Sequence, residues 1–170
     1  MTAPDAPHGI PVEEFAAAMQ LLPGAVTIVT TRQGDRPIGF TATAVCSLSA
    51  SPPQLLVCVN RSTRSYSALC ATRTFAVNVL HSGDRDLADA FARSPMEDRF
   101  KNGSWGTLET GAPILTGAVV SFDCHVSGLW EQASHGILCG LILATRQSDN
   151  APLLYARRSY TSLQGMPTVQ

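Results

Sequence analysis

Short runs of β-branched and other apolar residues, bounded by glycine, proline and polar positions, recur along most of the chain. Such runs are typical of strands. The loop at residues 33–37 suits a hairpin turn, so the run 38–48 is expected to return antiparallel to the run 25–31. Residues 132–135 are expected to turn between the two longest runs. The predicted strands cover residues 25–31, 38–48, 55–59, 75–80, 118–130, 136–145 and 152–155.

Three other stretches predict helices. The first covers residues 11–22, where Phe15 and Met19 fall on one face. The other two are expected at residues 62–71 and 84–92. Several strands at hairpin spacing, with only a few short helices, argue against a parallel doubly wound sheet. The pattern therefore predicts a mainly β fold, an antiparallel β-barrel with a few short flanking helices.

Length and composition indicate how many domains the chain forms and which residues belong to them. At 170 residues it is expected to form a single domain, over residues 11–165. Residues 1–10 are aperiodic and rich in proline, so we expect a disordered N-terminal tail. The five cysteines include Cys46, Cys58 and Cys139, which lie in apolar runs. Buried, reduced thiols are expected there.

Charge and hydropathy argue against a nucleic-acid partner and against a membrane segment. The formal net charge is −1 and the basic residues are scattered, so a nucleic-acid partner is not expected. No apolar run reaches the roughly 20 residues that a membrane helix needs. The first residues also lack a basic segment followed by an apolar one. We therefore expect a cytoplasmic protein without a membrane segment.

Common signatures of phosphate binding and hydrolysis are missing from the sequence. No G-x-G-x-x-G follows a predicted strand, and no G-x-x-x-x-G-K-[ST], G-x-S-x-G or H-E-x-x-H is present. The histidines lie far apart in the sequence, and Asp84, Asp86 and Asp89 are interpreted as the solvated face of a helix. A nucleotide would therefore have to be bound by residues other than those of a Rossmann or P-loop motif.

Two segments and one histidine carry the remaining candidate chemistry. Residues 39–49 contain no charge but many small and hydroxyl side chains, which suits either a ring-and-phosphate ligand or a plain strand. Residues 60–65 begin a predicted helix with Ser62 or Thr63 as its cap. Their two arginines suit either a phosphate site or a solvated surface. His135 falls in a turn and gains a role only if that turn folds over a ligand.

In their order and spacing, these segments resemble the short-chain flavin reductases over residues 12–163. The resemblance implies an FMN-binding split β-barrel that forms a homodimer, with the flavin near the subunit interface. It also implies NAD(P)H-dependent reduction of free FMN or FAD, and delivery of the reduced flavin to a separate monooxygenase. The matching segments are residues 15–22, 24–31, 39–49, 52–53, 75–80, 91–92, 98–100, 111–115 and 152–155, with Tyr160.

The resemblance also implies a set of site residues. The family usually has Gly-Asp-His-Thr where residues 133–136 read Ala-Ser-His-Gly, so the histidine that faces the nicotinamide is kept and its acidic neighbour is absent. Hydride passes directly between the two cofactors, so no catalytic side chain and no metal are expected. The cofactor-binding residues expected are Gly39, Phe40, Thr41, Ala42, Thr43, Ala44, Val45, Ser47, Ser49, Asn60, Arg61, Ser62, Arg64, Phe91, Ala92, His135 and Tyr155.

Two other interpretations stay open at the level of sequence. The altered turn at His135 is also compatible with a non-catalytic split barrel that binds flavin or haem. A small β-barrel that serves as an interaction module, without a cofactor, is the other interpretation. Flavin binding separates the last interpretation from the first two, and NADH oxidation with added flavin separates a reductase from a binding protein.

Overall fold

The computed structural model describes residues 8–163. Residues 1–7 of the expected tail and residues 164 and 165 of the expected domain lie outside the described residues, so the domain bounds stay a prediction. The helices are α1 (Val12–Met19), α2 (Arg64–Thr72), α3 (Arg85–Arg93) and the 3-10 turn η1 (Arg99–Lys101). The strands are β1 (Gly24–Ala25), β2 (Thr27–Gln33), β3 (Arg36–Ala42), β4 (Val45–Ala50), β5 (Pro53–Asn60), β6 (Thr74–Val79), β7 (Trp105–Gly106), β8 (Ile114–Leu115), β9 (Val120–Gln132), β10 (His135–Gln147), β11 (Leu153–Ala156) and β12 (Ser159–Ser162).

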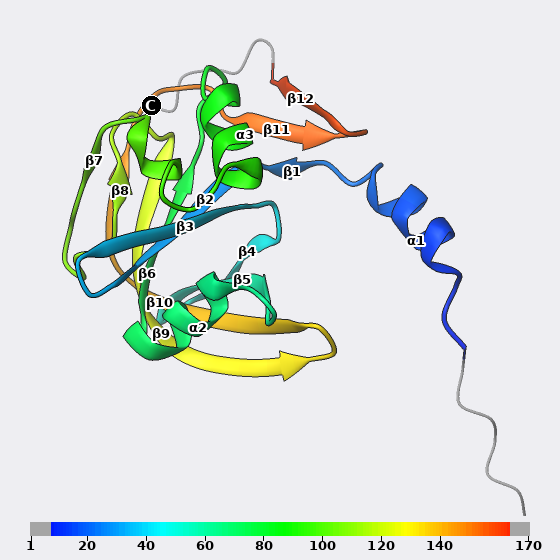
Figure 1. Ribbon diagram of the computed structural model, residues 1–170, viewed down its shortest axis with the longest axis horizontal. Coiled ribbons are helices and arrows are strands. Elements are labelled where there is room, and N and C mark those ends of the chain that lie inside the picture. Colours follow the sequence, from blue (N-terminus) through cyan, green and yellow to red (C-terminus); the bar gives the residue numbers. More distant parts are fainter. Residues whose placement is uncertain (1–7, 164–170) are drawn as a thin grey trace, which may run out of the picture.

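The main sheet is antiparallel throughout and has the strand order β3-β2-β6-β9-β10-β5-β4. Smaller sheets, β1-β11-β12 and β7-β8, lie at its margins (Figure 1). The helices are short, and α2 and α3 pack against the first strands of the main sheet. The mainly β, antiparallel fold expected from the sequence is therefore confirmed.

The apolar core lies inside the curved main sheet. Its largest cluster gathers buried side chains from β2, β5, β6, β9 and β10 around Phe75, and α2 covers one side with Leu69. A Cβ at Gly140 of β10 would lie 2.4 Å from Cζ of Phe75, so only glycine fits beside that ring. A second cluster lies under α3 and includes Leu87 and Phe91. These two clusters fix the positions of α2 and α3, the two helices that border the site.

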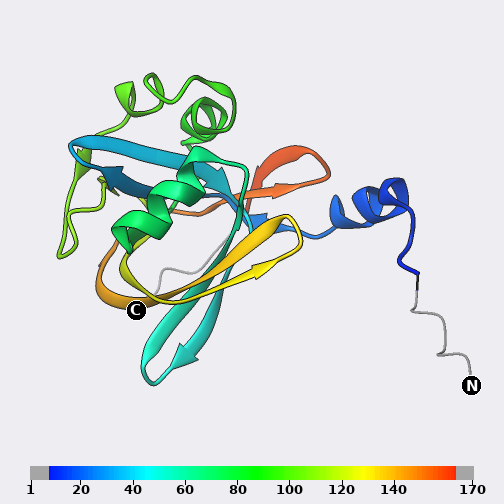
Figure 2. The ribbon, with the colours of Figure 1, turned by 60° about the horizontal axis from the view of Figure 1, so that its bottom comes forward.

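The expectation of one strand over residues 38–48 is wrong. β3 ends at Ala42, and the chain then turns sharply, with the amide of Val45 donating to the carbonyl of Thr43 at 3.0 Å. β4 pairs with β5 and not with β2. The two hairpins consequently point in different directions (Figure 2). Because the turn is made of small residues without glycine or proline, the sequence pattern gave no sign of a break.

The expected burial of the cysteine thiols also needs one correction. Cys139 is buried and Cys58 is half-buried, but Cys46 is exposed. Cys46 lies on β4, which is the edge strand of the main sheet. An edge strand has a pairing partner on one side only, so its apolar positions are less protected than the sequence run suggested.

Helix α1 projects from the body of the molecule (Figures 1 and 2). None of its residues is buried, and Val12, Phe15 and Met19 are 74%, 55% and 46% exposed. The helix is therefore present where the sequence predicted it, but its apolar face has no partner among the described residues. No helix in the described part of the chain is long and apolar enough to cross a membrane.

Candidate functional site

A cavity of about 540 Å³ lies where the end of β3, the end of β5 and the first turn of α2 meet the end of α3. Its lining combines small, hydroxyl and aromatic side chains with two arginines, and it contains no carboxylate. The lining residues are Phe40, Thr41, Ala42, Thr43, Ala44, Cys58, Val59, Asn60, Thr63, Arg64, Ser65, Phe91, Ala92, Met96, Arg99 and His135.

The bend between β3 and β4 forms one wall of this cavity. The hydroxyl of Thr41 donates to the carbonyl of Ala88 in α3 at 2.9 Å, and the hydroxyl of Thr27 donates to the carbonyl of Ala42 at 2.8 Å. These bonds fix the end of β3. In the described part of the chain, the amides of Thr43 and Ala44 donate no hydrogen bond. The bend therefore offers two backbone donors to a ligand.

The first turn of α2 forms the opposite wall. Thr63 caps the helix, because its Oγ1 accepts a hydrogen bond from the amide of Tyr66 at 3.2 Å. The amides of Arg64 and Ser65 belong to this first turn, where helical amides have no partner within the helix. The positive end of the helix and the exposed guanidinium of Arg64 favour an anion at this wall.

Arg61, another of the expected cofactor-binding residues, contacts the β9–β10 hairpin. Its Nη2 lies 2.6 Å from Oε2 of Glu131, and its Nη1 donates to the carbonyl of Ala133 at 3.2 Å. Arg61 thus ties the start of α2 to the β9–β10 hairpin and does not line the cavity. The hydroxyl of Tyr66 donates to Oε1 of Glu131 at 2.8 Å, and this bond, together with burial, raises the pKa of Tyr66 to about 12.

The β9–β10 hairpin brings His135 to the cavity. The side chain is exposed, and its Nδ1 lies 2.9 Å from Oγ of Ser134. A Cβ at Gly136 would lie 2.4 Å from Cε2 of Tyr66, so glycine is needed for the hairpin to pack against α2. The departure from the family's threonine at this position therefore has a packing reason in this chain.

Arg99 and an aromatic cluster support the cavity from the side of α3. Arg99 donates from Nη1 to the carbonyl of Gly39 at 2.7 Å and from Nε to the carbonyl of Ser94 at 3.0 Å. Burial lowers the pKa of Arg99. The ring of Phe91 contacts Phe100 at 4.9 Å and Trp105 at 5.5 Å between centroids.

Gly39 is what lets this aromatic cluster approach β3. A Cβ there would lie 2.7 Å from Cε1 of Phe91 and 3.1 Å from Cζ of Phe100. The residue is buried behind the wall and does not line the cavity.

Ten of the expected residues line the cavity, and seven do not. Val45, Ser47 and Ser49 lie beyond the bend, on β4. Gly39 is buried behind the wall that β3 forms, and Arg61 and Ser62, just before α2, are exposed and do not line the cavity. Tyr155 lines a neighbouring cavity of about 430 Å³ that shares Thr41, Ala42, Thr43 and Ala92 with the main one. Those that line the main cavity are Phe40, Thr41, Ala42, Thr43, Ala44, Asn60, Arg64, Phe91, Ala92 and His135.

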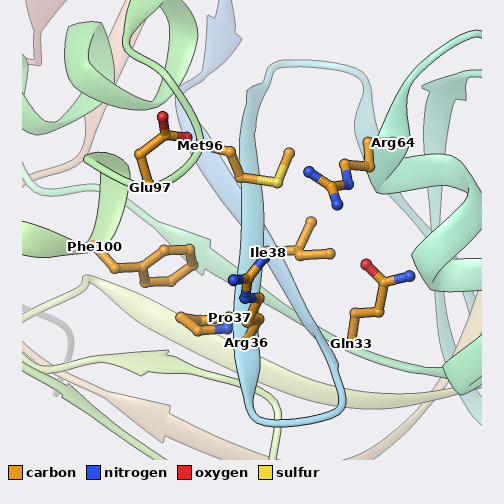
Figure 3. Close-up of a pocket in the computed structure, with 8 residues that line it drawn as sticks. All are labelled: Gln33, Arg36, Pro37, Ile38, Arg64, Met96, Glu97 and Phe100. Carbon is orange, nitrogen blue, oxygen red and sulfur yellow. The ribbon is translucent and has the colours of Figure 1, made fainter.

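Six further residues line the cavity that were not among the cofactor-binding residues expected from the sequence. Thr63 and Ser65 lie within residues 60–65, the arginine-containing segment that was singled out as a possible phosphate site. Arg99 lies within residues 98–100, which match the family. The sequence therefore marked the segments of these three residues, but not the residues themselves as part of the site. Cys58 and Val59 belong to a buried strand, and no pattern marks which end of a strand borders a cavity. Met96 lies in the loop after α3. A second neighbouring cavity, of about 570 Å³, shares Arg64 and Met96 with the main one (Figure 3).

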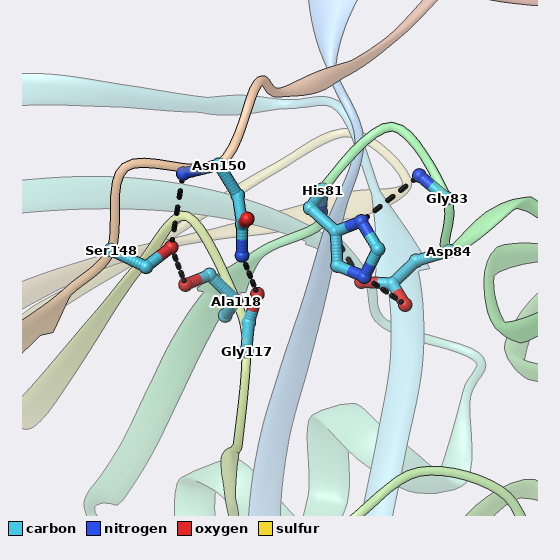
Figure 4. Close-up of polar contacts among 7 residues, drawn as sticks. All are labelled: His81, Gly83, Asp84, Gly117, Ala118, Ser148 and Asn150. Atoms are coloured by element: carbon cyan, nitrogen blue, oxygen red, sulfur yellow. Dashed lines mark hydrogen bonds and ion pairs between the residues drawn. The ribbon is translucent and has the colours of Figure 1, made fainter. Parts of the chain in front are cut away.

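The start of α3 is fixed by a polar loop (Figure 4). The amide of Gly83 donates to Nδ1 of His81 at 3.0 Å, and Nε2 of His81 lies 3.1 Å from Oδ1 of Asp84. Burial raises the pKa of Asp84, and His81 opposes this shift. Asp89 accepts a hydrogen bond from the hydroxyl of Tyr160 at 3.0 Å.

The interpretation of the three aspartates as a solvated face is therefore wrong for Asp84, whose side chain is 18% exposed, whereas the side chain of Asp89 is 37% exposed and Asp86 is exposed. Asp84 is bound by His81 of the preceding loop, and Asp89 by Tyr160 of β12. Among residues 8–163, no three histidine, cysteine, aspartate or glutamate side chains gather where they could hold a metal ion.

The fold is thus an antiparallel barrel with an open cavity whose lining holds two arginines and no carboxylate. Residues 19–164 match the model of the flavin reductase like domain. The chain is 42% identical over 153 residues to the FMN reductase (NADH) RutF 2 of Rhizobium rhizogenes, which covers 89% of this chain and 88% of that protein. The protein therefore belongs to the flavin reductase family.

Two solved structures extend the comparison. The NADH:FAD oxidoreductase SgcE6 of Streptomyces globisporus, in complex with NAD and FAD fragments, superposes with a TM-score of 0.84 at 30% identity, covering 90% of this chain and 93% of that one. BorF, the flavin reductase component of a bacterial two-component tryptophan halogenase, superposes with a TM-score of 0.83 at 26% identity. The superposition covers 90% of this chain and 98% of that one.

Proposed function

We propose that the protein catalyses NADH-dependent reduction of free FMN. The observation that carries this proposal is the cavity lining, which holds two arginines, backbone donors on two opposite walls and no carboxylate. Such a lining suits a ligand with a phosphate at one end and a ring that becomes more negative at the other. The names of the relatives support FMN and NADH as the pair, and the same chemistry applies to FAD and NADPH.

The residues present fit a flavin mononucleotide. The amides of the first α2 turn and the guanidinium of Arg64 would hold the phosphate. The amides of Thr43 and Ala44 would donate to the polar edge of the ring, and Ala42 and Ala92 leave room for its face. A bound flavin supplies the hydride-accepting ring, so the chain needs only to bind and orient the two partners.

For His135 we propose a role in positioning the nicotinamide. It lies at the rim of the cavity, on the hairpin that Arg61 and Glu131 anchor. Because its Nδ1 is engaged by Ser134, its Nε2 is the ring atom left for a ligand. A non-catalytic flavin- or haem-binding role is less well supported, since the relatives at about 42% identity are reductases.

Protein freed of flavin tests this function directly. We expect it to oxidise NADH when FMN is added and not in its absence. The cavity is open and much of its lining is exposed, which suits a flavin that binds and leaves as a substrate. Reduced flavin would then pass to a separate monooxygenase in the cytoplasm, as BorF is the reductase component of a two-component system.

We further propose that the protein is a homodimer in which α1 packs on the second copy. A helix of this length is not stable alone in water, so its exposed apolar face needs a partner. Leu48, Trp130 and Leu143 are also exposed, by 47%, 59% and 49%, and offer apolar surface for such contacts.

Replacing Phe15 and Met19 together with aspartate is expected to convert the dimer to a monomer, because both charges would be buried in the interface. Light scattering during size-exclusion chromatography measures the mass. Glu13→Gln on the same helix is the matched control and should stay dimeric. A double variant that keeps the mass of the wild type would contradict the proposed role of α1.

A further inference from the structure

The tip of the β9–β10 hairpin has a conformation that its own residues do not favour. Gln132 pairs with His135, so only Ala133 and Ser134 make the turn. Ala133 has a φ of +49°, in the left-handed region, which a residue with a Cβ adopts only at a cost in free energy. A turn of this kind persists when contacts from outside the hairpin hold it in place.

Arg61 makes such contacts with both carbonyls of the tip. Its amide donates to the carbonyl of Ser134 at 3.0 Å, and its Nη1 donates to the carbonyl of Ala133 at 3.2 Å. The side chain is 42% exposed, and a free arginine side chain would occupy many rotamers. Its Nη2 lies 2.6 Å from Oε2 of Glu131, so this carboxylate keeps the guanidinium at the tip.

The other oxygen of Glu131 binds helix α2. The hydroxyl of Tyr66, a residue that is only 8% exposed, donates to Oε1 at 2.8 Å. The ring of Tyr66 covers Gly136, the residue that pairs with Glu131 across the hairpin. Among residues 8–163, no other carboxylate contacts Arg61 or Tyr66. One side chain therefore links the hairpin both to α2 and to the residue that holds the tip.

Helix α2 has other contacts that hold it, and the tip does not. Thr63 caps the helix, and Leu69 is buried in the main core. Residues 131–135, in contrast, are all exposed, so no core packing holds the tip. Loss of the Glu131 carboxylate should therefore shift the tip and leave the phosphate-binding start of α2 in place.

We infer that Glu131 is a positioning residue for hydride transfer. Through Arg61 and Tyr66 it fixes the tip of the hairpin, and His135 follows that tip directly and lines the cavity. The tip thus sets where His135 holds the nicotinamide relative to the flavin ring, and reactants held out of line react slowly. Glu131 itself does not line the cavity. The inference rests on the proposed function.

Glu131→Ala tests the inference when NADH and FMN are measured separately. We expect kcat/KM for NADH to fall about tenfold, the size of an exposed ion pair and a hydrogen bond together. The Kd of FMN, measured by fluorescence titration, should stay unchanged, because α2 and the bend after β3 keep their positions. Equal losses for NADH and FMN would indicate general damage to the site and overturn the inference.

A double-mutant cycle with His135→Ala shows whether Glu131 acts through the histidine. Loss of His135 should lower kcat/KM for NADH without abolishing turnover, because hydride passes directly between the two cofactors. Once His135 is absent, Glu131→Ala should cause no further loss. If the two losses multiply instead, Glu131 does not act through His135 and the inference is overturned.

Two further variants complete the comparison. Glu131→Gln keeps an oxygen acceptor for Tyr66 and loses the ion pair with Arg61, so its loss should be smaller than that of the alanine variant. It also takes the place of the alanine variant in the cycle if that variant does not fold. Glu109→Ala is the control, since it removes an exposed carboxylate that forms no ion pair in the described part of the chain. It should change neither kcat/KM nor the affinity for FMN.

Hydrogen exchange of the backbone amides gives a readout that does not depend on turnover. In Glu131→Ala the amides of residues 131–136 should exchange faster than in the wild type, and those of α2 should not. Unchanged exchange at the tip overturns the inference. Absence of flavin-dependent NADH oxidation in the wild type would instead overturn the proposed function, and the exchange would still decide whether Glu131 holds the tip.

Discussion

Replacing Thr43 with aspartate is expected to weaken FMN binding by roughly a hundredfold, since like charges brought together in a binding site cost several kcal/mol. Thr43 lies at the bend between β3 and β4 and lines the cavity. Its side chain packs against Gly24, where an added Cβ would lie 3.1 Å from Cβ of Thr43. A carboxylate there would repel both the phosphate and the ring as it gains charge. Turnover should fall together with binding.

Thr43→Asn is the matched control, because asparagine has the shape of aspartate without its charge. Fluorescence titration of FMN measures both variants. We expect the asparagine variant to bind FMN nearly as the wild type does, and added salt to restore part of the loss in the aspartate variant. Equal affinities for the two variants would show that Thr43 is not beside the flavin.

Replacing Arg64 with alanine is expected to weaken FMN binding about tenfold, because a charge-assisted hydrogen bond to phosphate contributes about 1.5 kcal/mol once solvent exposure is allowed for. Riboflavin has the same ring and no phosphate, so its affinity should not change. The comparison of the two ligands thus separates loss of a phosphate contact from general damage to the site.

The same titration with Arg146→Ala controls for the loss of one positive charge from the protein surface. This variant should bind FMN as the wild type does. Parallel losses for FMN and riboflavin in Arg64→Ala would place the phosphate elsewhere.

The sequence predicted the elements of the fold well where burial is regular. The runs around Val57, Val77 and Leu138 alternate or stay apolar because they form the core, and their strands were found within a few residues of their ends. The break at Thr43 and Ala44 was missed, because a turn closed by a backbone hydrogen bond needs no special residue. The partner of Asp89 was missed because Tyr160 comes from the distant strand β12, and the partner of Asp84 was missed because His81 lies in the loop before the helix.

The candidate site could be predicted only in part, because some of its contacts also join segments that are far apart in the sequence. Small and hydroxyl residues singled out the end of β3 and the start of α2, and both segments line the cavity. The sequence did not show that Arg61 forms an ion pair with Glu131, since the two are brought together only when β5 pairs with β10 and β10 pairs with β9. Nor did it show that β4 leaves the site after the bend, which removes Ser47 and Ser49 from the lining.

The central claim is that this chain binds a flavin and a nicotinamide together so that hydride passes between them. The measurement that tests it most directly is NADH oxidation by flavin-free protein, with and without added FMN. We predict that oxidation requires both protein and FMN and saturates with FMN concentration. Clear FMN binding without NADH oxidation, and also without NADPH oxidation, would contradict the claim and leave a flavin-binding protein in its place.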